Sequence, residues 1–452
     1  MPVCDDVIAH SKKAGSDECE AAFCSKRTIT VRITDSEIAE VKENEEQSVG
    51  VRLVRGKRIS VAHSTSLDAA KLVDGAMVSM RRLSERKFWK QFPQNAPKYQ
   101  VIERTNDPKV WNMSPSDASD IAQEMINSAL HQKVTSISGS LNVVCEEFEL
   151  QNTSGLQKSE RATYVAGVIN SDSSYAGRTI SGIGQDNSRT LAGFDARMVG
   201  SEATEMCVNS LSPQKAVVET TSIIFEPMAV GELLTFVFAP NFFLKTYSEN
   251  RSCFSEKIGT KVAVDGFTLS DSPHMADGLG SRSFDDEGVP TRTTHYIRDG
   301  IFENTYSDCY TAFKEGVTSS GNASRQGSPL GRSSEPIPFA SPHNMTINAG
   351  RQGRGEVVRE TKSGLVVSRL WYTYAVNPIK GDFSCTTRSG IWNIENGEIT
   401  TPARPVRIIH NLQTLLQNIS AVADNARTVL SWAASPVTAP SIRCDGIAVS
   451  PI

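Results

Sequence analysis

The chain has 452 residues, 39% of them hydrophobic and 22% charged, which is typical of a globular protein with two or three cores. The net charge of -4, without a long run of like charges, argues against nucleic-acid binding, which needs a basic face or tail. The first residues lack the pattern of a signal peptide, and the most apolar segment, Met228 to Pro240, carries Glu232 and is too short to span a bilayer. No membrane contact is therefore expected, and nine scattered cysteines without a CxxC motif predict reduced thiols in a cytoplasmic protein.

The first part of the chain is predicted to run helix, strands, helix. Helical spacing of apolar residues predicts one helix over Val3 to Lys13 and another, capped by Ser66, over Leu67 to Leu83. Alternating patterns between them predict strands over Glu20–Ile33, Glu37–Asn44, Gln47–Val54 and Ile59–His63.

The same order recurs after a Pro- and Asn-rich connector, Phe92 to Pro115. The predicted elements are a helix over Ser114–His131, strands over Thr135–Leu150 and Ala162–Ser171, and a helix over Leu191–Leu211. The segment Ser181 to Gln185, S-G-I-G-Q, lacks a full dinucleotide fingerprint and is taken as a loop. We therefore expect an α/β domain over residues 1–211, with a possible duplication of residues 1–90 in 114–211.

Residues 216–452 are predicted to form a second, mainly β and barrel-like domain, so that the fold class is α+β. The expected strands are Val217–Phe225, Lys261–Phe267, Thr293–Arg298, Gly364–Tyr374 and Ile391–Asn393; the expected helices are Glu226–Phe238 and Ile409–Val429. The segment Ser319 to Asn344 is rich in Gly, Ser and Pro, which is typical of a mobile surface loop or of a loop lining a substrate passage.

No common catalytic motif is present. The seven histidines never lie within five residues of each other, so no H-E-x-x-H zinc helix exists. A dispersed metal site remains an alternative, and its ligands would be His274, His295 and His343 with Asp285 or Asp286. Cys385 near Arg388 is either a nucleophile or, as is commoner for a lone cysteine, an inert thiol.

Three adjacent carboxylates, Asp285, Asp286 and Glu287, precede Gly288 and Pro290. Adjacent carboxylates repel unless they are solvated, hydrogen-bonded or paired with cations, and the glycine and proline enforce a turn. The segment is therefore either an exposed turn or a fixed element near a substrate strand or a subunit interface.

These segments together resemble the TldD/PmbA family, once called modulators of DNA gyrase. The resemblance covers most of the chain and is strongest from about residue 216 onward. It is carried by D-G-L-G-S-R-S-F-D-D-E-G-V-P-T (277–291), I-R-D-G-I-F-E-N (297–304), Y-T-A-F-K-E-G-V-T-S-S-G-N-A-S-R (310–325) and K-G-D-F-S-C-T-T-R-S-G-I-W-N-I-E-N-G-E-I (380–399). Gly321 and Asn322 in the third segment join the acidic segment as candidates for substrate or interface contact.

The resemblance also implies where metal chemistry is missing. The TldD branch of the family carries an H-E-x-x-x-H zinc helix and a cysteine ligand near the carboxyl terminus. Here Phe225 and Val230 occupy the two histidine positions, Glu226 keeps the glutamate, and Cys444 lies beyond the family's cysteine. Phenyl and isopropyl groups offer no lone pair to zinc, so the chain is similar to the TldE/PmbA branch and is expected to hold no metal.

What the resemblance implies is a heterodimer in which a TldD-type subunit supplies zinc and this chain helps to enclose unfolded peptide substrates. Alternatives are a homodimeric, stand-alone hydrolase with a site around Asp285, Asp286 and His274, and a peptide-binding regulatory protein.

Overall fold

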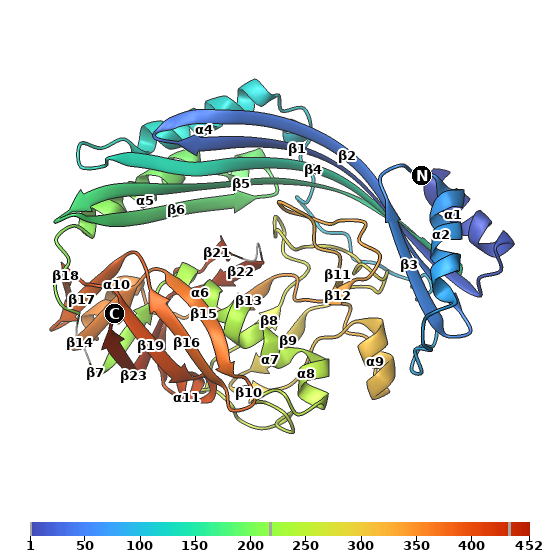
Figure 1. Cartoon of the computed structure of the whole chain (residues 1–452). Helices are drawn as coiled ribbons and strands as arrows, with labels where there is room; N and C mark the ends of the chain where they lie inside the picture. Colours follow the sequence, from blue (N-terminus) through green and yellow to red (C-terminus); the bar gives the residue numbers. More distant parts are fainter. Residues whose placement is uncertain (1, 217–218, 433–434) are drawn as a thin grey trace.

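The computed structural model describes residues 2–216, 219–432 and 435–452. The amino-terminal part is a curved antiparallel sheet in the order β3-β2-β1-β4-β5-β6 (Figure 1). Its strands are β1 (Glu18–Thr34), β2 (Glu37–Arg55), β3 (Arg58–Ser64), β4 (Ser136–Asn152), β5 (Gln157–Tyr175) and β6 (Arg178–Ser188). The two runs predicted between residues 37 and 54 form one strand, β2. Read outward from the β1–β4 pair, the two halves of the sheet have the same strand order.

Four helices cover this sheet. They are α1 (Pro2–Lys13), α2 (Ala69–Met80), α4 (Pro115–Ala129) and α5 (Ala196–Asn209); the short α3 (Pro108–Trp111) and a 3-10 turn (Leu191–Gly193) lie in the connections. The predicted start of α4 is confirmed, because Ser114 and Asp117 form a reciprocal capping box. α2 starts later than predicted, since Asp68 rather than Ser66 accepts the hydrogen bond from the Lys71 amide, at 3.0 Å.

The alternation of side chains along β1 divides the sheet into a helix-covered face and an inner face. Odd-numbered residues pack beneath the helices: Cys19, Ala21 and Phe23 with α1 and α2, and Ile29, Val31 and Ile33 with α4 and α5. Ala22 and Cys24 point the other way and pack against Phe284 of the carboxyl-terminal part. The inner face of the sheet thus faces the carboxyl-terminal part of the chain (Figure 1).

The carboxyl-terminal part contains two large sheets and a two-stranded ribbon, β11 (Ala323–Ser324) with β12 (Phe339–Ala340). The larger sheet has the order β15-β16-β19-β23-β7-β14-β17-β18, with β20 paired to β23: β7 (Glu219–Phe225), β14 (Ser363–Val367), β15 (Leu370–Asn377), β16 (Asp382–Thr387), β17 (Ile391–Glu395), β18 (Glu398–Pro402), β19 (Val406–Asn411), β20 (Ile419–Val422) and β23 (Ile442–Pro451). The second has the order β10-β9-β8-β13-β22-β21: β8 (Leu269–Asp271), β9 (Thr294–Arg298), β10 (Ile301–Phe302), β13 (Met345–Ile347), β21 (Arg427–Leu430) and β22 (Pro436–Ala439).

The α+β class is confirmed, but the barrel-like form is not. The strand order of each sheet ends in two different strands, β15 and β18 in the larger one, so these sheets of the described chain remain open. The helices of this part are α6 (Pro227–Leu233), a π-helical turn (Leu234–Phe238), α7 (Ala239–Phe242), α8 (Leu244–Ser248), α9 (Cys309–Glu315), α10 (Arg354–Arg359) and α11 (Leu412–Gln417). Within the described ranges no helix is both long and apolar enough to cross a membrane.

Three predicted elements are wrong. Ser181 to Gln185 is not a loop but part of β6, where glycines allow the backbone of α5 to approach closely; a Cβ on Gly182 would lie 2.1 Å from the Ala203 carbonyl. The predicted late helix, 409–429, is split into β19, α11, β20 and β21, because Asn411 caps a helix of only six residues. The predicted strand 261–267 contains only one isolated bridge, from Lys261 to Ile301.

Candidate functional site

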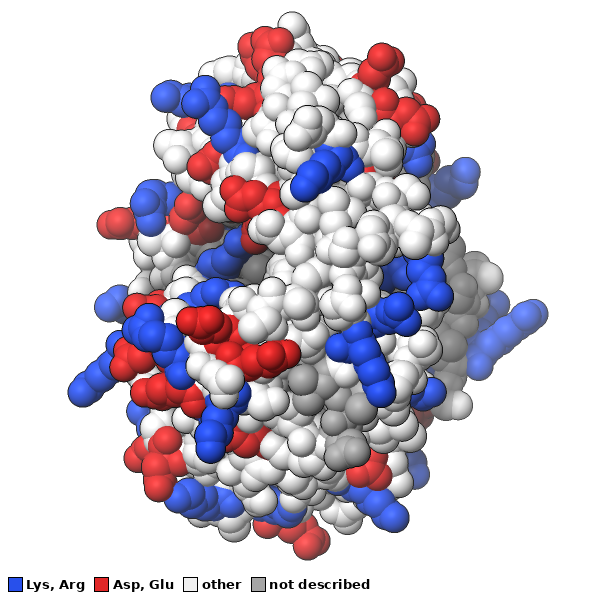
Figure 2. All heavy atoms as spheres, turned by 90° about the vertical axis from the view of Figure 1, so that its left-hand side faces the viewer, with Lys and Arg blue, Asp and Glu red and all other residues white. Residues whose placement is uncertain are grey.

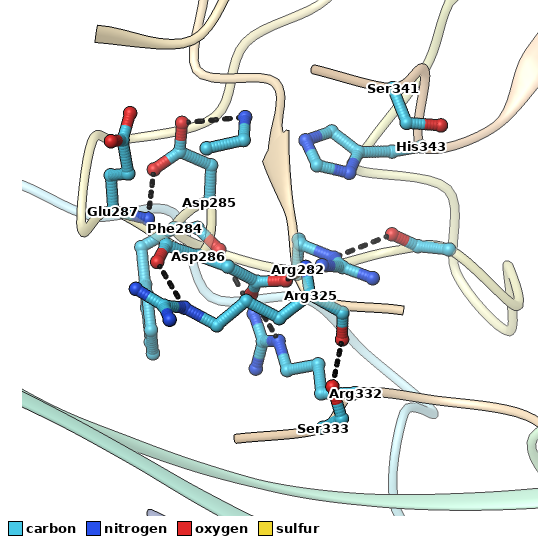
Figure 3. A network of polar contacts seen from close by, with 12 residues as sticks. Arg282, Phe284, Asp285, Asp286, Glu287, Arg325, Arg332, Ser333, Ser341 and His343 are labelled. Carbon is cyan, nitrogen blue, oxygen red and sulfur yellow. Dashed lines mark hydrogen bonds and ion pairs between the residues drawn. The ribbon is translucent and has the colours of Figure 1, made fainter. Parts of the chain in front are cut away.

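The acidic segment lies in the interior. Asp285, Asp286 and Glu287 are at most 1% exposed, so the exposed-turn alternative is wrong. Asp285 accepts a hydrogen bond from the Glu287 amide at 3.0 Å (Figure 3), and further ones from the amides of Val289 and Ala323 at 2.9 and 3.0 Å. Burial and the neighbouring Glu287 carboxylate raise the pKa of Asp285 well above its usual value. Asp285 therefore holds the turn together as a buried acceptor.

Asp286 and Glu287 each meet arginines. Asp286 contacts Arg282 at 3.0 Å and Arg332 at 2.8 Å, and these two cations hold its pKa below the usual value although burial acts in the opposite direction. Glu287 accepts from Arg52 at 2.9 Å and from the Cys309 amide at 2.7 Å. The carboxylates of Asp286 and Glu287 are thus compensated as buried charges must be.

These ion pairs join the two parts of the chain. Arg52 of β2 bridges Glu287 and Glu20, and Glu20 also pairs with Arg325. Arg332 reaches Glu160 of β5 at 2.7 Å while it holds Asp286. We call the set Glu20, Arg52, Glu160, Arg282, Asp286, Glu287, Arg325 and Arg332 the ionic network. Its position shows that the acidic segment fastens the sheet to the carboxyl-terminal part.

Gly288 and Pro290 shape the turn, and Gly321 packs against it. Gly288 has φ +87°, and a Cβ there would lie 2.2 Å from the Leu156 side chain. A Cβ on Gly321, φ +77°, would lie 2.8 Å from the Pro290 carbonyl. Asn322, beside Gly321, donates to Asp271 at 2.6 Å. The structure therefore brings these substrate or interface candidates together, as a buried, tightly packed unit.

The segment Ser319 to Asn344 is mostly buried, and its prediction as a surface loop is wrong. Asp271 accepts from the amides of His343 and Asn344 at 3.0 and 2.7 Å, and the His343 ring bonds the Gly321 carbonyl at 2.8 Å. Burial lowers the pKa of His343 to about 4, so this histidine is neutral at physiological pH.

The remaining candidates from the sequence are dispersed. His274 bonds the Thr291 hydroxyl at 3.0 Å, and burial lowers the pKa of both His274 and His295. Across the described residues, no three His, Cys, Asp or Glu side chains form a group that could hold a metal ion. All nine cysteines are buried and unpaired, and burial raises the pKa of Cys385 to about 12, which leaves it a poor nucleophile.

Phe225 ends β7 and Val230 lies in α6. They are 1% and 3% exposed and, together with Cys444, line an apolar void of about 10 Å³. Glu226, between them in sequence, faces a different cavity, of about 320 Å³. Its carboxylate accepts from Arg354 and from the Ser441 hydroxyl, both at 2.8 Å. Phe225, Val230 and Cys444 therefore meet at one apolar void, whereas Glu226 faces a separate cavity.

A further cavity, of about 340 Å³, lies between the inner face of the sheet and α6. The sheet contributes Asn142, Ala166, Gly167, Val168, Ile183 and Gln185; the opposite side is formed by Met228, Glu232, Pro329, Leu330, Arg369, Leu430, Ser431 and Trp432. Burial raises the pKa of Glu232 to about 7, while the Trp432 amide and Arg369 act in the opposite direction. Sequence reasoning missed this site, although a glutamate within an apolar helical segment was a usable signal.

Arg369 is the most unusual residue of this cavity. It is 6% exposed, and its guanidinium lies over the rings of Trp371 and Trp432, 5.1 and 5.3 Å from their centroids. Within the described part of the chain its guanidinium makes no hydrogen bond and no ion pair within 4.0 Å, although the Glu232 carboxyl acts on it electrostatically from farther away. A buried cation is therefore available to a ligand.

Comparison with known proteins assigns the family. Residues 218–451, just over half of the chain, match the model of the PmbA/TldA metallopeptidase C-terminal domain, and residues 19–79 match that of PmbA/TldA metallopeptidase domain 1. The chain belongs to the TldD/PmbA family.

Relatives in the TldD/PmbA family are distant. An uncharacterized protein of Methanocaldococcus jannaschii is 23% identical over 84% of this chain and 86% of its own length. The metalloprotease PmbA of Escherichia coli O157:H7 is 27% identical over 55% of this chain and 51% of its own length, so the match spans about half of that relative. The Haemophilus influenzae metalloprotease TldD homolog is 24% identical over 93% and 88% of the two chains.

Solved structures share the TldD/PmbA fold over the whole chain. TldE from Thermococcus kodakarensis superposes with a TM-score of 0.89 at 22% identity, covering 99% of this chain and 100% of the other. A putative modulator of DNA gyrase from Thermotoga maritima gives 0.87 at 21% identity and covers 99% of each. The geometry at these positions does not fit the zinc that a metallopeptidase family implies, because Phe225 and Val230 offer no ligand atoms and Glu226 is engaged elsewhere.

Proposed function

We propose that this chain is a TldE/PmbA-type subunit of a TldD/TldE-type metallopeptidase: it does not cleave peptides itself but shapes the chamber that receives unfolded peptide. The observation that carries the proposal is the state of Glu226. A catalytic glutamate must be free to take a proton from water, whereas both oxygens of Glu226 accept hydrogen bonds from this chain, from Arg354 and Ser441. Its sequence neighbours at the two histidine positions face the dry core.

The arrangement of the two parts supports a role in holding substrate. The ionic network fixes the inner face of the sheet opposite α6, and the cavity of about 340 Å³ lies between them. The larger sheet has open edges at β15 and β18, where an extended peptide could add as a strand through backbone hydrogen bonds. Such binding tolerates many sequences, as processing of unfolded peptides requires.

Figure 2 shows one face of the molecule, on which acidic and basic side chains are interspersed around an uncharged middle.

The test is reconstitution. The purified chain, a TldD-type subunit from the same genome and their mixture are each incubated with a fluorescently labelled unfolded protein. We expect the mixture to elute as one complex by size exclusion and to cleave the substrate, and the chain alone to be inactive. An equal mass of heat-denatured chain serves as the control for the mixture. Chelator-sensitive cleavage by the isolated chain would overturn the proposal, and so would the absence of a complex.

A further inference from the structure

The unpartnered guanidinium of Arg369 points to a ligand. Burying an arginine without an anion is expensive, so a buried arginine normally pairs with a carboxylate or with several acceptors. Those of the ionic network do: Arg332, 3% exposed at its side chain, contacts both Asp286 and Glu160. Arg369 is 6% exposed, its guanidinium lies over the two tryptophan rings, and Glu232, the carboxyl that acts on it electrostatically, makes no ion pair with it within 4.0 Å. Its planar, fork-like donors match a carboxylate.

The rest of the cavity is suited to an apolar group. Alternation along β5 turns the side chains of Ala166 and Val168 inward, because a Cβ on Gly167 would point the opposite way, 2.7 Å from Phe194 beneath the helices. Met228, Leu330 and Leu430 lie on the other side. A volume of about 340 Å³ exceeds that of a single apolar side chain, which leaves room for adjoining backbone.

One polar group on the wall is suited to peptide backbone. The Asn142 side-chain oxygen accepts from the Thr30 hydroxyl at 3.0 Å, and among the described residues its amide nitrogen makes no hydrogen bond. That nitrogen can donate to a carbonyl. Gln185, in contrast, is already bonded to the backbone of Leu430.

We propose that Arg369 binds the terminal carboxylate of a peptide whose apolar carboxyl-terminal side chain fills this cavity. The proposal rests on the proposed function, since it names the end of the peptide that the subunit holds. Peptides released by a peptidase carry a new terminal carboxylate, so the site would take a cleavage product or the tail of a substrate.

Glu232 is compatible with such an anion. Glu232 and Arg369 are the two ionisable side chains that line the cavity. With a pKa of about 7, the Glu232 carboxyl is protonated in a large fraction of molecules near neutral pH, and it can then donate a hydrogen bond to the bound carboxylate. In this arrangement Arg369 binds the carboxylate, Glu232 orients it, and no covalent bond changes.

Isothermal titration calorimetry with the full chain tests the proposal. The probes are an acetylated hexapeptide ending in leucine with a free carboxylate, and the same peptide as its carboxyl-terminal amide. We expect the acid to bind at least tenfold more tightly than the amide. Equal affinities, or tighter binding of the amide, would overturn the proposal.

A variant pair locates the effect. Arg369→Gln should reduce the affinity for the acid to that for the amide and leave the amide unchanged. Arg388→Gln is the matched control, because Arg388 is exposed and lies over the same Trp371 ring, at 5.6 Å, but does not line the cavity. Acid selectivity that survives in Arg369→Gln, or is lost in Arg388→Gln, would contradict the assignment.

Two further arms keep the result interpretable. Val168→Trp fills the cavity from the sheet and leaves the Arg369 side chain in place, and it should weaken binding of the acid even if Arg369→Gln folds poorly; unchanged binding would contradict the cavity assignment. N-acetyl-leucine and a long-chain fatty acid distinguish the source of the carboxylate, and tighter binding of the fatty acid than of the peptide would overturn a peptide ligand.

Complex formation with the TldD-type subunit, measured in parallel, separates a failure of this proposal from a failure of the proposed function.

Discussion

Buried charges are paired directly in the ionic network but lie apart in the cavity beside α6. In the network, Asp286 and Glu287 contact Arg332, Arg282 and Arg52 directly, at 2.8–3.0 Å, so that these charges need no water to compensate them. In the cavity, Glu232 and Arg369 lie on the same space without an ion pair closer than 4.0 Å. Buried charges that are satisfied internally hold a fold together, whereas buried charges left apart around a space are available to a ligand.

The largest expected effect breaks the network. Arg332→Ala removes the cation shared by Asp286 and Glu160, which leaves Glu160 without its arginine and Asp286 with Arg282 alone, so we expect the free energy of unfolding to fall by about 4 kcal/mol. Urea unfolding followed by circular dichroism measures it. Arg161→Ala is the control, because Arg161 is 68% exposed in its pair with Glu147 and should cost less than about 1 kcal/mol. Similar losses in both variants would refute a structural role for the network.

A smaller effect is expected at the turn that carries the network. Gly288 and Gly155 have nearly equal φ values, +87° and +88°, but only at Gly288 would a Cβ overlap a neighbour, Leu156. Gly155→Ala should therefore destabilise by about 1–2 kcal/mol from backbone strain alone. Gly288→Ala should add about 1–3 kcal/mol from overpacking. Thermal unfolding of both variants compares them, and a larger loss for Gly155→Ala would contradict the packing of this turn.

The smallest expected effect sharpens the view of the cavity. Burial raises the pKa of Glu232 from 4.5 to about 7, so the folded chain binds this proton more tightly than the unfolded chain. The wild type therefore loses stability as the pH rises from 4.5 through 7, by up to about 3 kcal/mol, and nothing further above that range. Glu232→Gln avoids this loss. The difference in unfolding free energy, Glu232→Gln minus wild type, should therefore rise between pH 4.5 and 7 in urea titrations. A difference that stays constant over this range would show that Glu232 is not desolvated.

Much of the amino-terminal part could be predicted from the sequence, because its strands are long and alternate regularly. The capping box at Ser114 and Asp117 marked a helix start by local chemistry alone. Prediction failed where tertiary contacts override the local pattern. β6 is rich in glycine because it packs closely on α5, and Leu412, Leu415 and Leu416 have helical spacing although strands lie on both sides of their short helix.

The candidate site was harder to predict, because its partners are far apart in the chain. The acidic segment stood out at once, but the sequence could not show that Arg52, 235 residues from Glu287, would compensate it. Glu232, Arg369 and Trp432 come from α6, a loop between strands and the turn after β21, and nothing in their local sequences links them. The assignment of Phe225 and Val230 to ligand positions rests on resemblance and remains a prediction.

The division of β1 into helix-covered and inward positions limits how this family can vary in length. Residues such as Phe23 and Cys24 serve opposite faces, so inserting one residue within the strand would exchange all the faces beyond it at once, whereas inserting two would restore them. Natural length changes should therefore collect in the turns and in the connector before α4. An alignment of relatives can be screened for single-residue gaps in this strand as a quick check on its register.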